Sequence, residues 1–290
     1  MDERARRAAI ALYDRFTHEG LDRRTFMTEL TRIAGGAAAA TALLGSVAAR
    51  AQAAPSIAEA DPRIEAGPVN LETSHGRIYE FYRASPVRVG GQAPPVVIVI
   101  HENRGLNAHI RDVARRFAVA GYRAYAPDML SLNGGTPADE DRARALIGQI
   151  DLAAATSDLA ALVRDISGEG GKAGIVGFCW GGAMVHRVAL AAGQALSAGV
   201  SFYGPAPEPA EAAGLQSPLL VILAGRDERV NRTALPYVAA VQAARKPICT
   251  ITYRDVDHAF HNDTSAARYN RAAAEDAWSE TLRFFNQHLR

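Results

Sequence analysis

Cysteine, tryptophan and net charge are all scarce in this sequence. Only 2 cysteines and 2 tryptophans occur among 290 residues, and 32 basic against 31 acidic side chains leave a formal charge of +1. Two cysteines allow at most one disulfide, which excludes a disulfide-stapled miniprotein. The low charge offers no basic field for nucleic acid, so no nucleic-acid partner is expected. Glycine and proline, at 25 and 14 residues, are too few for a collagen-like or largely disordered chain.

The sequence also lacks the motifs by which many proteins hold a cofactor. It contains no Cys-x-x-Cys pair, no cluster of histidine and cysteine at metal-binding spacing, and no glycine-rich phosphate-binding loop. We therefore expect no cofactor and no metal. The chain does have length, because a protein of this size buries roughly 75% of the surface that its unfolded state exposes. A single large domain can form its core without staples.

The first 53 residues differ from the rest of the chain. They carry eight arginines against six acidic residues, a balance of +2, which leaves 24 basic and 25 acidic side chains for residues 54–290. A charged stretch is followed by an apolar stretch over residues 33–49 and then by Ala51-Gln52-Ala53, a small-x-small cleavage pattern. This order of charged, apolar and cleavable parts is typical of an export signal.

Two adjacent arginines indicate the export route. Arg23 and Arg24, with Phe26 two residues on, match the twin-arginine signature of bacterial proteins that are exported folded. We expect residues 1–53 to be such a signal, with the twin-arginine machinery as partner and a periplasmic or exported location. A permanent membrane anchor is the second alternative, because the 17-residue apolar stretch is shorter than the ~20 residues of a spanning helix. The third is an alanine-rich helix that packs on the domain, as an arm between subunits.

The rest of the chain alternates between strand and helix patterns. Residues 54–68 are expected to form a linker and residues 69–290 a single domain that begins with a hairpin over residues 69–82. Such alternation predicts an α/β fold with a mostly parallel sheet, helices on both faces and functional groups at the carboxyl ends of the strands. The later strands are expected at residues 95–100, 122–126, 173–178, 198–203, 218–224 and 248–253, and the helices at 110–121, 153–166, 181–191, 233–244 and 266–288.

One strand end carries a candidate nucleophile. The strand 173–178 runs into Gly177-Phe178-Cys179-Trp180-Gly181-Gly182 and then into a helix. This is the pattern of a nucleophile elbow, with cysteine where serine is commoner. The turn places the Cys179 thiol at a helix N-terminus, which favours the thiolate. The alternative is a buried cysteine in a tight glycine-rich turn.

A carboxylate and a histidine follow two later strands in the chain order of an α/β-hydrolase triad. Asp227 follows the strand 218–224, and His258 follows the strand 248–253. His258 would take the thiol proton, and Asp227 would orient the imidazole ring. The neighbouring acids Glu228 and Asp257 are interpreted as solvated, and His261 as a residue at the rim of the site. Cys249, inside a strand, is expected to be an inert core thiol.

The loop after the strand 95–100 is the expected source of an oxyanion-hole amide. This fold takes one amide from that loop and one from the residue after the nucleophile, which here gives the backbone N–H groups of Asn103 and Trp180. Losing one such donor typically costs about 3 to 4 kcal/mol of transition-state stabilisation. Glu102 in the same loop is either part of the site or a surface carboxylate.

Five short motifs stand at the ends of the expected strands. They are His101-Glu102-Asn103-Arg104-Gly105-Leu106-Asn107, Tyr125-Ala126-Pro127-Asp128, Gly177-Phe178-Cys179-Trp180-Gly181-Gly182, Gly225-Arg226-Asp227 and Asp257-His258-Ala259-Phe260. In this order they resemble the dienelactone hydrolase (carboxymethylenebutenolidase) family, from about Leu71 to the C-terminus. The resemblance implies an α/β-hydrolase fold and a triad of Cys179, Asp227 and His258. It also implies that Glu102 interacts with the nucleophile and helps to control its ionisation.

The sequence departs from the family pattern at the substrate carboxylate. Members that cleave dienelactone have an arginine four residues after the catalytic histidine, and here that position is Asn262. Arg104 and His261 are candidates to supply compensating charge as substrate-binding residues, and the alternative for both is a solvated rim. Arg142 and Arg144 lie in the segment where the family has a second carboxylate-binding arginine. The stretch 131–137 beside the expected mouth would contribute to substrate choice.

These observations predict a hydrolase that cleaves an ester or lactone through an acyl-Cys179 intermediate. One alternative is a broader carboxylesterase or thioesterase on the same triad. Another is a non-catalytic binding protein in which Cys179 serves as an oxidisable sensor thiol. A sensor has no need for a histidine that is paired with an aspartate at a strand end, so we expect an enzyme with a small-molecule ester or lactone substrate.

Overall fold

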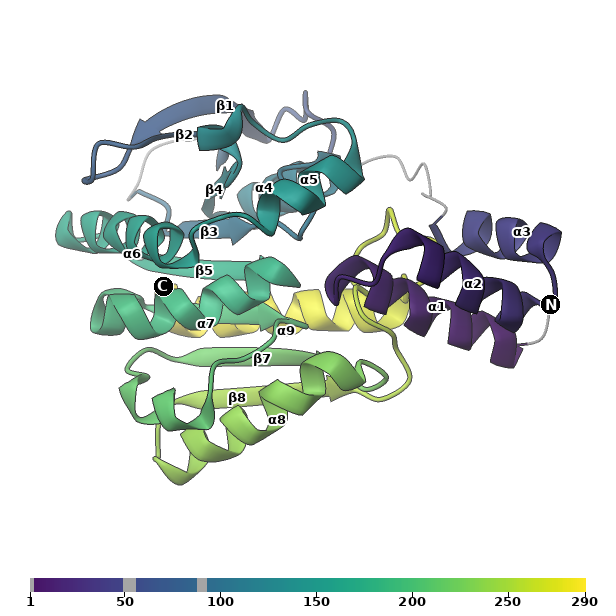
Figure 1. Ribbon diagram of the computed structural model, residues 1–290. Helices are drawn as coiled ribbons and strands as arrows, with labels where there is room; N and C mark the ends of the chain where they lie inside the picture. Colours follow the sequence, from purple (N-terminus) through teal and green to yellow (C-terminus); the bar gives the residue numbers. More distant parts are fainter. Residues whose placement is uncertain (1–2, 49–55, 88–92) are drawn as a thin grey trace.

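The computed structural model describes residues 3–48, 56–87 and 93–290, and its largest element is an eight-stranded sheet with the order β1-β2-β4-β3-β5-β6-β7-β8 (Figure 1). The β1–β2 hairpin is antiparallel and pairs antiparallel with β4, and the other neighbours are parallel. This mostly parallel sheet confirms the predicted α/β class. The strands are β1 (Ile64–Glu72), β2 (Ile78–Pro86), β3 (Val96–Ile100), β4 (Arg123–Pro127), β5 (Ala173–Phe178), β6 (Ala198–Phe202), β7 (Leu219–Ala224) and β8 (Ile248–Tyr253).

Helices cover both faces of the sheet because alternate residues of each central strand point to opposite faces. In β3, Val97 and Val99 join one apolar core, and Ile98 and Ile100 join the other. The first core lies under α4 and α9, and the second under α6, α7 and α8. These helices are α4 (Ala108–Val119), α6 (Leu152–Gly168), α7 (Trp180–Ala192), α8 (Glu228–Ala243) and α9 (Arg271–Leu289), joined by the short α5 (Glu140–Ile147) and three 3₁₀ turns, Ser131–Asn133, Gly193–Ala195 and Pro209–Gly214.

Side-chain caps explain where two helices differ from expectation. Helix α8 begins at Glu228 rather than near 233, because the Asp227 carboxylate accepts a hydrogen bond from Val230 N at 3.1 Å. Helix α9 begins at Arg271 rather than near 266, because the Asn270 side chain caps it. At the other end of the domain, β1 begins at Ile64, so residues 64–68 belong to a strand and not to the expected linker.

The position of Cys249 corrects another expectation. Cys249 lies in β8 as predicted, but β8 is the last strand of the sheet and the Cys249 side chain is exposed. An edge strand has a neighbour on one side only, and its alternate residues need not face a core. Cys249 is therefore a free surface thiol and not a core thiol.

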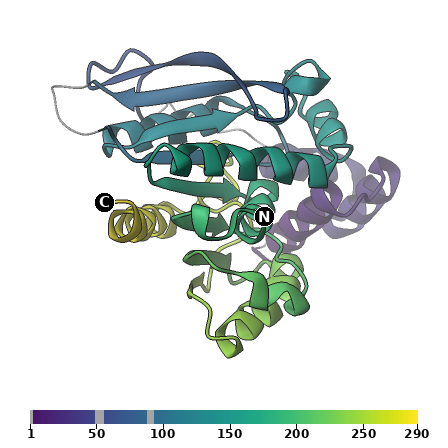
Figure 2. The same ribbon diagram turned by 90° about the vertical axis from the view of Figure 1, so that its left-hand side faces the viewer.

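Residues 3–48 form three helices with an apolar core of their own. Helices α1 (Glu3–His18), α2 (Arg23–Ala34) and α3 (Ala37–Ala48) pack around buried side chains such as Phe26, Leu30 and Leu43. Asp22 caps α2 through hydrogen bonds from Arg24 N and Thr25 N. In both views these purple helices form a separate body beside the sheet (Figures 1 and 2). The expected cleavage site, Ala51-Gln52-Ala53, lies outside the described residues.

No single helix in the described ranges has the length and apolarity to cross a membrane. Two bent helix pairs pass by length and composition together, α2 with α3 at 105° and α5 with α6 at 88°.

Candidate active site

Cys179 lies in a strained turn between β5 and α7. Its backbone has φ 57° and ψ −112°, in the left-handed half of conformational space that non-glycine residues rarely adopt. The close packing of this turn requires glycine, since a Cβ on Gly181 would lie 2.5 Å from the Ile100 carbonyl oxygen and 2.6 Å from that of His101. The turn presents the thiol at the N-terminus of α7, as the elbow motif predicts.

The loops after β7 and β8 bring Asp227 and His258 together. His258 Nδ1 lies 2.5 Å from Asp227 Oδ2, and the two residues are each 4% exposed. The buried Nε2 of His258 makes no hydrogen bond to any described residue. Because Asp227 occupies Nδ1, the ring is fixed with Nε2 free for proton transfer. The acidic alternatives Glu228 and Asp257 are not partners of His258 in any hydrogen bond or ion pair of the described residues.

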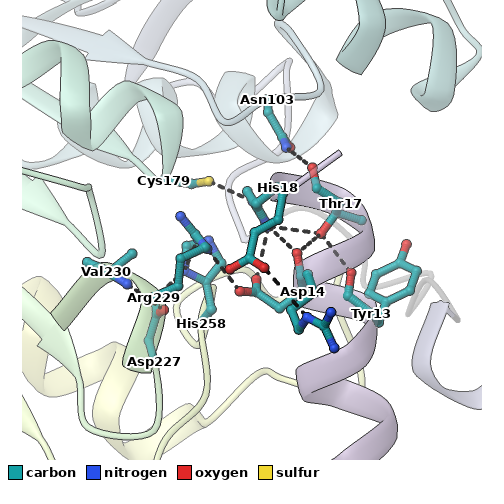
Figure 3. Close-up of polar contacts among 12 residues, drawn as sticks. Tyr13, Asp14, Thr17, His18, Asn103, Cys179, Asp227, Arg229, Val230 and His258 are labelled. Atoms are coloured by element: carbon teal, nitrogen blue, oxygen red, sulfur yellow. Dashed lines mark hydrogen bonds and ion pairs between the residues drawn. The ribbon is translucent and has the colours of Figure 1, made fainter. Parts of the chain in front are cut away.

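A second histidine, from the N-terminal helix α1, contacts the sulfur directly (Figure 3). His18 Nε2 lies 3.1 Å from Cys179 Sγ, and the His18 and His258 rings are 4.8 Å apart. His18 Nδ1 forms an ion pair with Asp14 Oδ1 at 3.0 Å. Sequence reasoning missed His18 because the export pattern explained this segment. The available signal was the spacing, since Asp14 and His18 are four residues apart and share a helix face.

The site stabilises a thiolate between two imidazolium rings. Burial opposes ionisation of Cys179, but the positive charges of His18 and then His258 outweigh it and lower the thiol pKa to about 5. Burial likewise opposes the charged form of His258, and the negative charges of Asp14, Asp227 and Cys179 raise its pKa well above the ordinary value. The His18 pKa is also raised, because the charge of Cys179 and the contact with Asp14 outweigh the effect of burial.

Glu102 is buried and is not a surface carboxylate. Its Oε2 accepts a hydrogen bond of 2.7 Å from Asn262 Nδ2, so the residue at the family's arginine position contacts this glutamate. Burial opposes ionisation, but the positive charges of His109, Arg104 and Arg268 outweigh it and lower the Glu102 pKa. The sulfur takes its hydrogen bond from His18, whereas the resemblance implied an interaction with Glu102.

The two residues expected to supply oxyanion-hole amides lie at the ends of neighbouring strands. Asn103 follows β3 and Trp180 opens α7 after β5, and the register of these strands pairs Ile100 with Gly177. The N–H of Trp180 has no acceptor within its own helix, because it lies in the first turn. The Asn103 side chain donates a hydrogen bond of 3.1 Å to the backbone carbonyl of Thr17 in α1.

The candidate substrate-binding residues lie in different places. Arg104 donates a hydrogen bond to the Tyr13 hydroxyl at 3.2 Å and pairs with Glu140 at 3.3 Å. His261 is 2% exposed and stacks on Phe178 with ring centroids 5.1 Å apart, so it is a core residue and the expected position at the rim is wrong. The Arg144 guanidinium lies over the Phe16 ring of α1 at 4.8 Å.

Two groups of side chains at this site have a spacing that a metal ion could bridge. Ligand atoms of His18, Cys179 and His258 lie within 4.8 Å of one another, and so do those of Asp14, Asp227 and His258. Thiolate and imidazole suit a soft or borderline ion such as Zn²⁺. The His18–Cys179 contact of 3.1 Å is a direct hydrogen bond, which a bound ion would have to replace.

Comparisons of the sequence and of the fold find similar proteins. The chain is 31% identical over 241 residues to a "Putative carboxymethylenebutenolidase" of Methylorubrum extorquens, a match that covers 77% of this chain and 81% of the relative. It is 32% identical over 246 residues to a protein of the same name from Escherichia coli K12, covering 79% and 89%. A crystal structure titled "Putative Dienelactone Hydrolase" from Klebsiella pneumoniae superposes with a TM-score of 0.68 at 29% identity, covering 77% of this chain and 99% of that one. The sequence profile of the dienelactone hydrolase family matches residues 80–289, and the chain belongs to this family of α/β hydrolases.

Proposed function

We propose that the protein hydrolyses an ester or lactone through a covalent intermediate on Cys179. The observation that carries this proposal is the meeting of three strand ends. The ligand atoms of Cys179, in its strained elbow, and of His258 lie within 4.8 Å of each other, and Asp227 holds the His258 ring at 2.5 Å. Nucleophile, base and orienting carboxylate thus have the arrangement that acyl transfer needs.

The reaction divides between the residues as follows. The Cys179 thiolate attacks the acyl carbon, and the backbone N–H groups of Asn103 and Trp180 bind the developing oxyanion. His258 gives its proton to the departing alkoxide, which leaves as the alcohol and leaves the acyl group on sulfur. His258 then takes a proton from water as the water attacks the thioester, which releases the acid and restores the thiolate. Ester and water are consumed, and acid and alcohol are formed.

Substitution of the nucleophile tests this mechanism. In a chain that begins at Ala54, hydrolysis of a small activated aryl ester should fall to the uncatalysed background in Cys179→Ala. The matched control is Cys249→Ser, which removes the other cysteine on the exposed edge of β8 and should leave the rate unchanged. Equal rates in the chain from Ala54 and in its Cys179→Ala variant would overturn the cysteine mechanism.

A second candidate function with the same catalytic residues is that of a broader carboxylesterase or thioesterase. Asn262 stands where the family's dienelactone-cleaving members have an arginine, and its side chain is engaged by Glu102. A site without that arginine has less charge for a substrate carboxylate. Comparing kcat/KM for cis- and trans-dienelactone with that for uncharged aryl esters and thioesters separates the two candidates.

We also propose that residues 1–53 are a twin-arginine export signal and that the hydrolase acts outside the cytoplasm. The exposed pair Arg23 and Arg24 at the start of α2 supports this proposal. Replacing both by lysine should keep the protein in the cytoplasm. Undiminished recovery of this variant from the periplasm, with an N-terminus near Ala54, would count against the twin-arginine route.

A further inference from the structure

Helix α1 covers the sulfur on which the proposed function depends. Cys179 is 3% exposed, and the group on its Sγ is the His18 ring. A cleft of about 340 Å³ runs beside α1 and reaches Asp227 and His258, but Cys179 does not line it. An acyl carbon must come within about 3 to 3.5 Å of the nucleophile to react. His18 Nε2, at 3.1 Å from the sulfur, occupies that space.

Polar contacts hold α1 in this position. The Asp14 carboxylate bridges two groups, with Oδ1 3.0 Å from His18 Nδ1 and Oδ2 3.2 Å from Arg229 Nε of the hydrolase domain (Figure 3). The Thr17 carbonyl accepts the hydrogen bond from the Asn103 side chain, in the loop that would supply an oxyanion-hole amide. The contacts of Asp14 with Arg229 and of Thr17 with Asn103 therefore hold α1 where His18 meets the sulfur.

Tyr13 adds a second anchor between α1 and the hydrolase domain. Its hydroxyl accepts a hydrogen bond from Arg104 at 3.2 Å, and the Arg268 guanidinium lies over its ring at 5.7 Å. One turn on, Phe16 lies under Arg144. Arginines of the hydrolase domain thus surround one face of α1, and the charge of Asp14 complements theirs.

The N-terminal helices are built as a unit that can separate from the domain. The buried core of α1, α2 and α3 contains residues 9–47 only, and the two cores of the hydrolase domain contain no residue from 3–48. The described contacts of α1 at the site are hydrogen bonds, ion pairs and cation–π contacts, which water and salt can replace, and one edge-to-face contact between the His18 and His258 rings. Both hydrolase cores therefore stay intact when α1 leaves.

We infer that α1 is an internal ligand of the catalytic centre, which keeps the Cys179 thiolate covered in the intact chain and must leave before substrate binds. The inference extends the proposed function, in which Cys179 is the nucleophile. Its consequence is latency, because removal of residues 1–53 in one piece would uncover the sulfur, and with it the proposed esterase activity.

Alkylation of the thiol by iodoacetamide tests the inference without a substrate. The exposed Cys249 is an internal standard, so peptide mass spectrometry gives the ratio of Cys179 to Cys249 labelling within each sample. The full chain is compared with its Tyr13→Ala/Asp14→Ala variant, which loses both anchors, and with the control Arg7→Ala, whose ion pair to Glu3 lies within α1. Each protein is labelled at a pH where its rate of Cys179 alkylation no longer changes with pH, so that differences in thiol pKa do not affect the comparison.

The double variant should label Cys179 at least about tenfold faster than the full chain, which corresponds to about 1.4 kcal/mol of lost docking, and Arg7→Ala should match the full chain. A chain that begins at Ala54 should label at least as fast as the double variant. Equal Cys179 to Cys249 ratios in the full chain, the double variant and the shortened chain would overturn the inference. If the variants label faster but no form cleaves esters, the covering helix stands and the proposed function fails. If labelling is equal in all forms and the intact chain is fully active, the covering helix is wrong and the proposed function stands.

Discussion

Two aspartate–histidine pairs meet at one sulfur, and they come from different parts of the molecule. Asp227 and His258 belong to loops after β7 and β8, where the buried sheet fixes their backbone. Asp14 and His18 lie one turn apart on α1, a helix whose apolar core is separate from that of the sheet. The two pairs have the same side chains, but the first is fixed to the sheet and the second lies on a helix that can separate from it. A pair anchored at strand ends suits repeated proton transfer, and a pair on a separate helix suits reversible covering.

Substituting each histidine in turn should show most clearly that the two pairs have different roles. In a chain that begins at Ala54, where α1 no longer covers the sulfur, His258→Gln removes the proton carrier and should lower kcat for an activated ester about 10³-fold or more, the scale of general acid–base catalysis. His18→Gln removes a group that the proposed reaction does not use, and it should leave the activity of the full chain unchanged or higher. A comparable loss in both variants would mean that His18 takes part in the chemistry.

The pH dependence of Cys179 labelling should show the contribution of each pair to the thiolate. The folded pKa of about 5 lies below the ordinary thiol value, so the thiolate fraction is constant well above pH 5 and falls as pH drops through about 5. The labelling rate should follow the same curve. In His18→Gln one positive neighbour is lost, so the midpoint should move to higher pH even as the plateau rate rises. An unmoved midpoint would assign the thiolate to His258 alone.

Shortening one buried side chain in the N-terminal core should show whether the N-terminal helices and the hydrolase domain unfold in separate transitions. Leu30 is 1% exposed among α1, α2 and α3, and Leu30→Ala should destabilise that unit by about 2 to 5 kcal/mol. The main thermal transition of the hydrolase domain should stay in place, because its cores contain no residue of this unit. The measurement is calorimetry of the full chain and of its Leu30→Ala variant. A single thermal transition that shifts as a whole would show that the two regions fold together.

The smallest effect is expected at the surface thiol of the edge strand. Cys249→Ser should change the free energy of unfolding by no more than about 0.5 kcal/mol, the range for surface substitutions without a special role. Denaturant unfolding measures this change. A loss of 2 kcal/mol or more would restore the core position that its strand pattern first indicated.

The central strands could be predicted from the sequence because their signal is local. The β-branched run at β3 and the glycine-rich turn after β5 each reflect what a strand buried on both faces, or a sharp elbow, requires. Cys179, Asp227 and His258 followed, since parallel strands place their carboxyl ends along one edge. The sheet of eight strands brings these three side chains together as that logic predicts.

The features that could not be predicted depend on contacts between distant parts of the chain. Whether Cys249 faces a helix depends on β8 lying at the sheet edge, which strand pattern alone does not determine. His261 follows a loop motif, yet its ring packs on Phe178 in the core. His18 lies 161 positions before Cys179, and no periodicity relates the two. An export pattern also explained the same residues, so nothing in the segment pointed to a contact with the nucleophile.

Trapping the acyl group tests the cysteine mechanism most directly. A chain that begins at Ala54 is mixed with a fast aryl ester, quenched in acid within one turnover and digested for peptide mass spectrometry. The acyl group is expected on Cys179 as a thioester, which decays on the timescale of turnover and is absent from Cys179→Ala. Turnover with the acyl group on another residue, or an undiminished rate in Cys179→Ala, would contradict the cysteine mechanism.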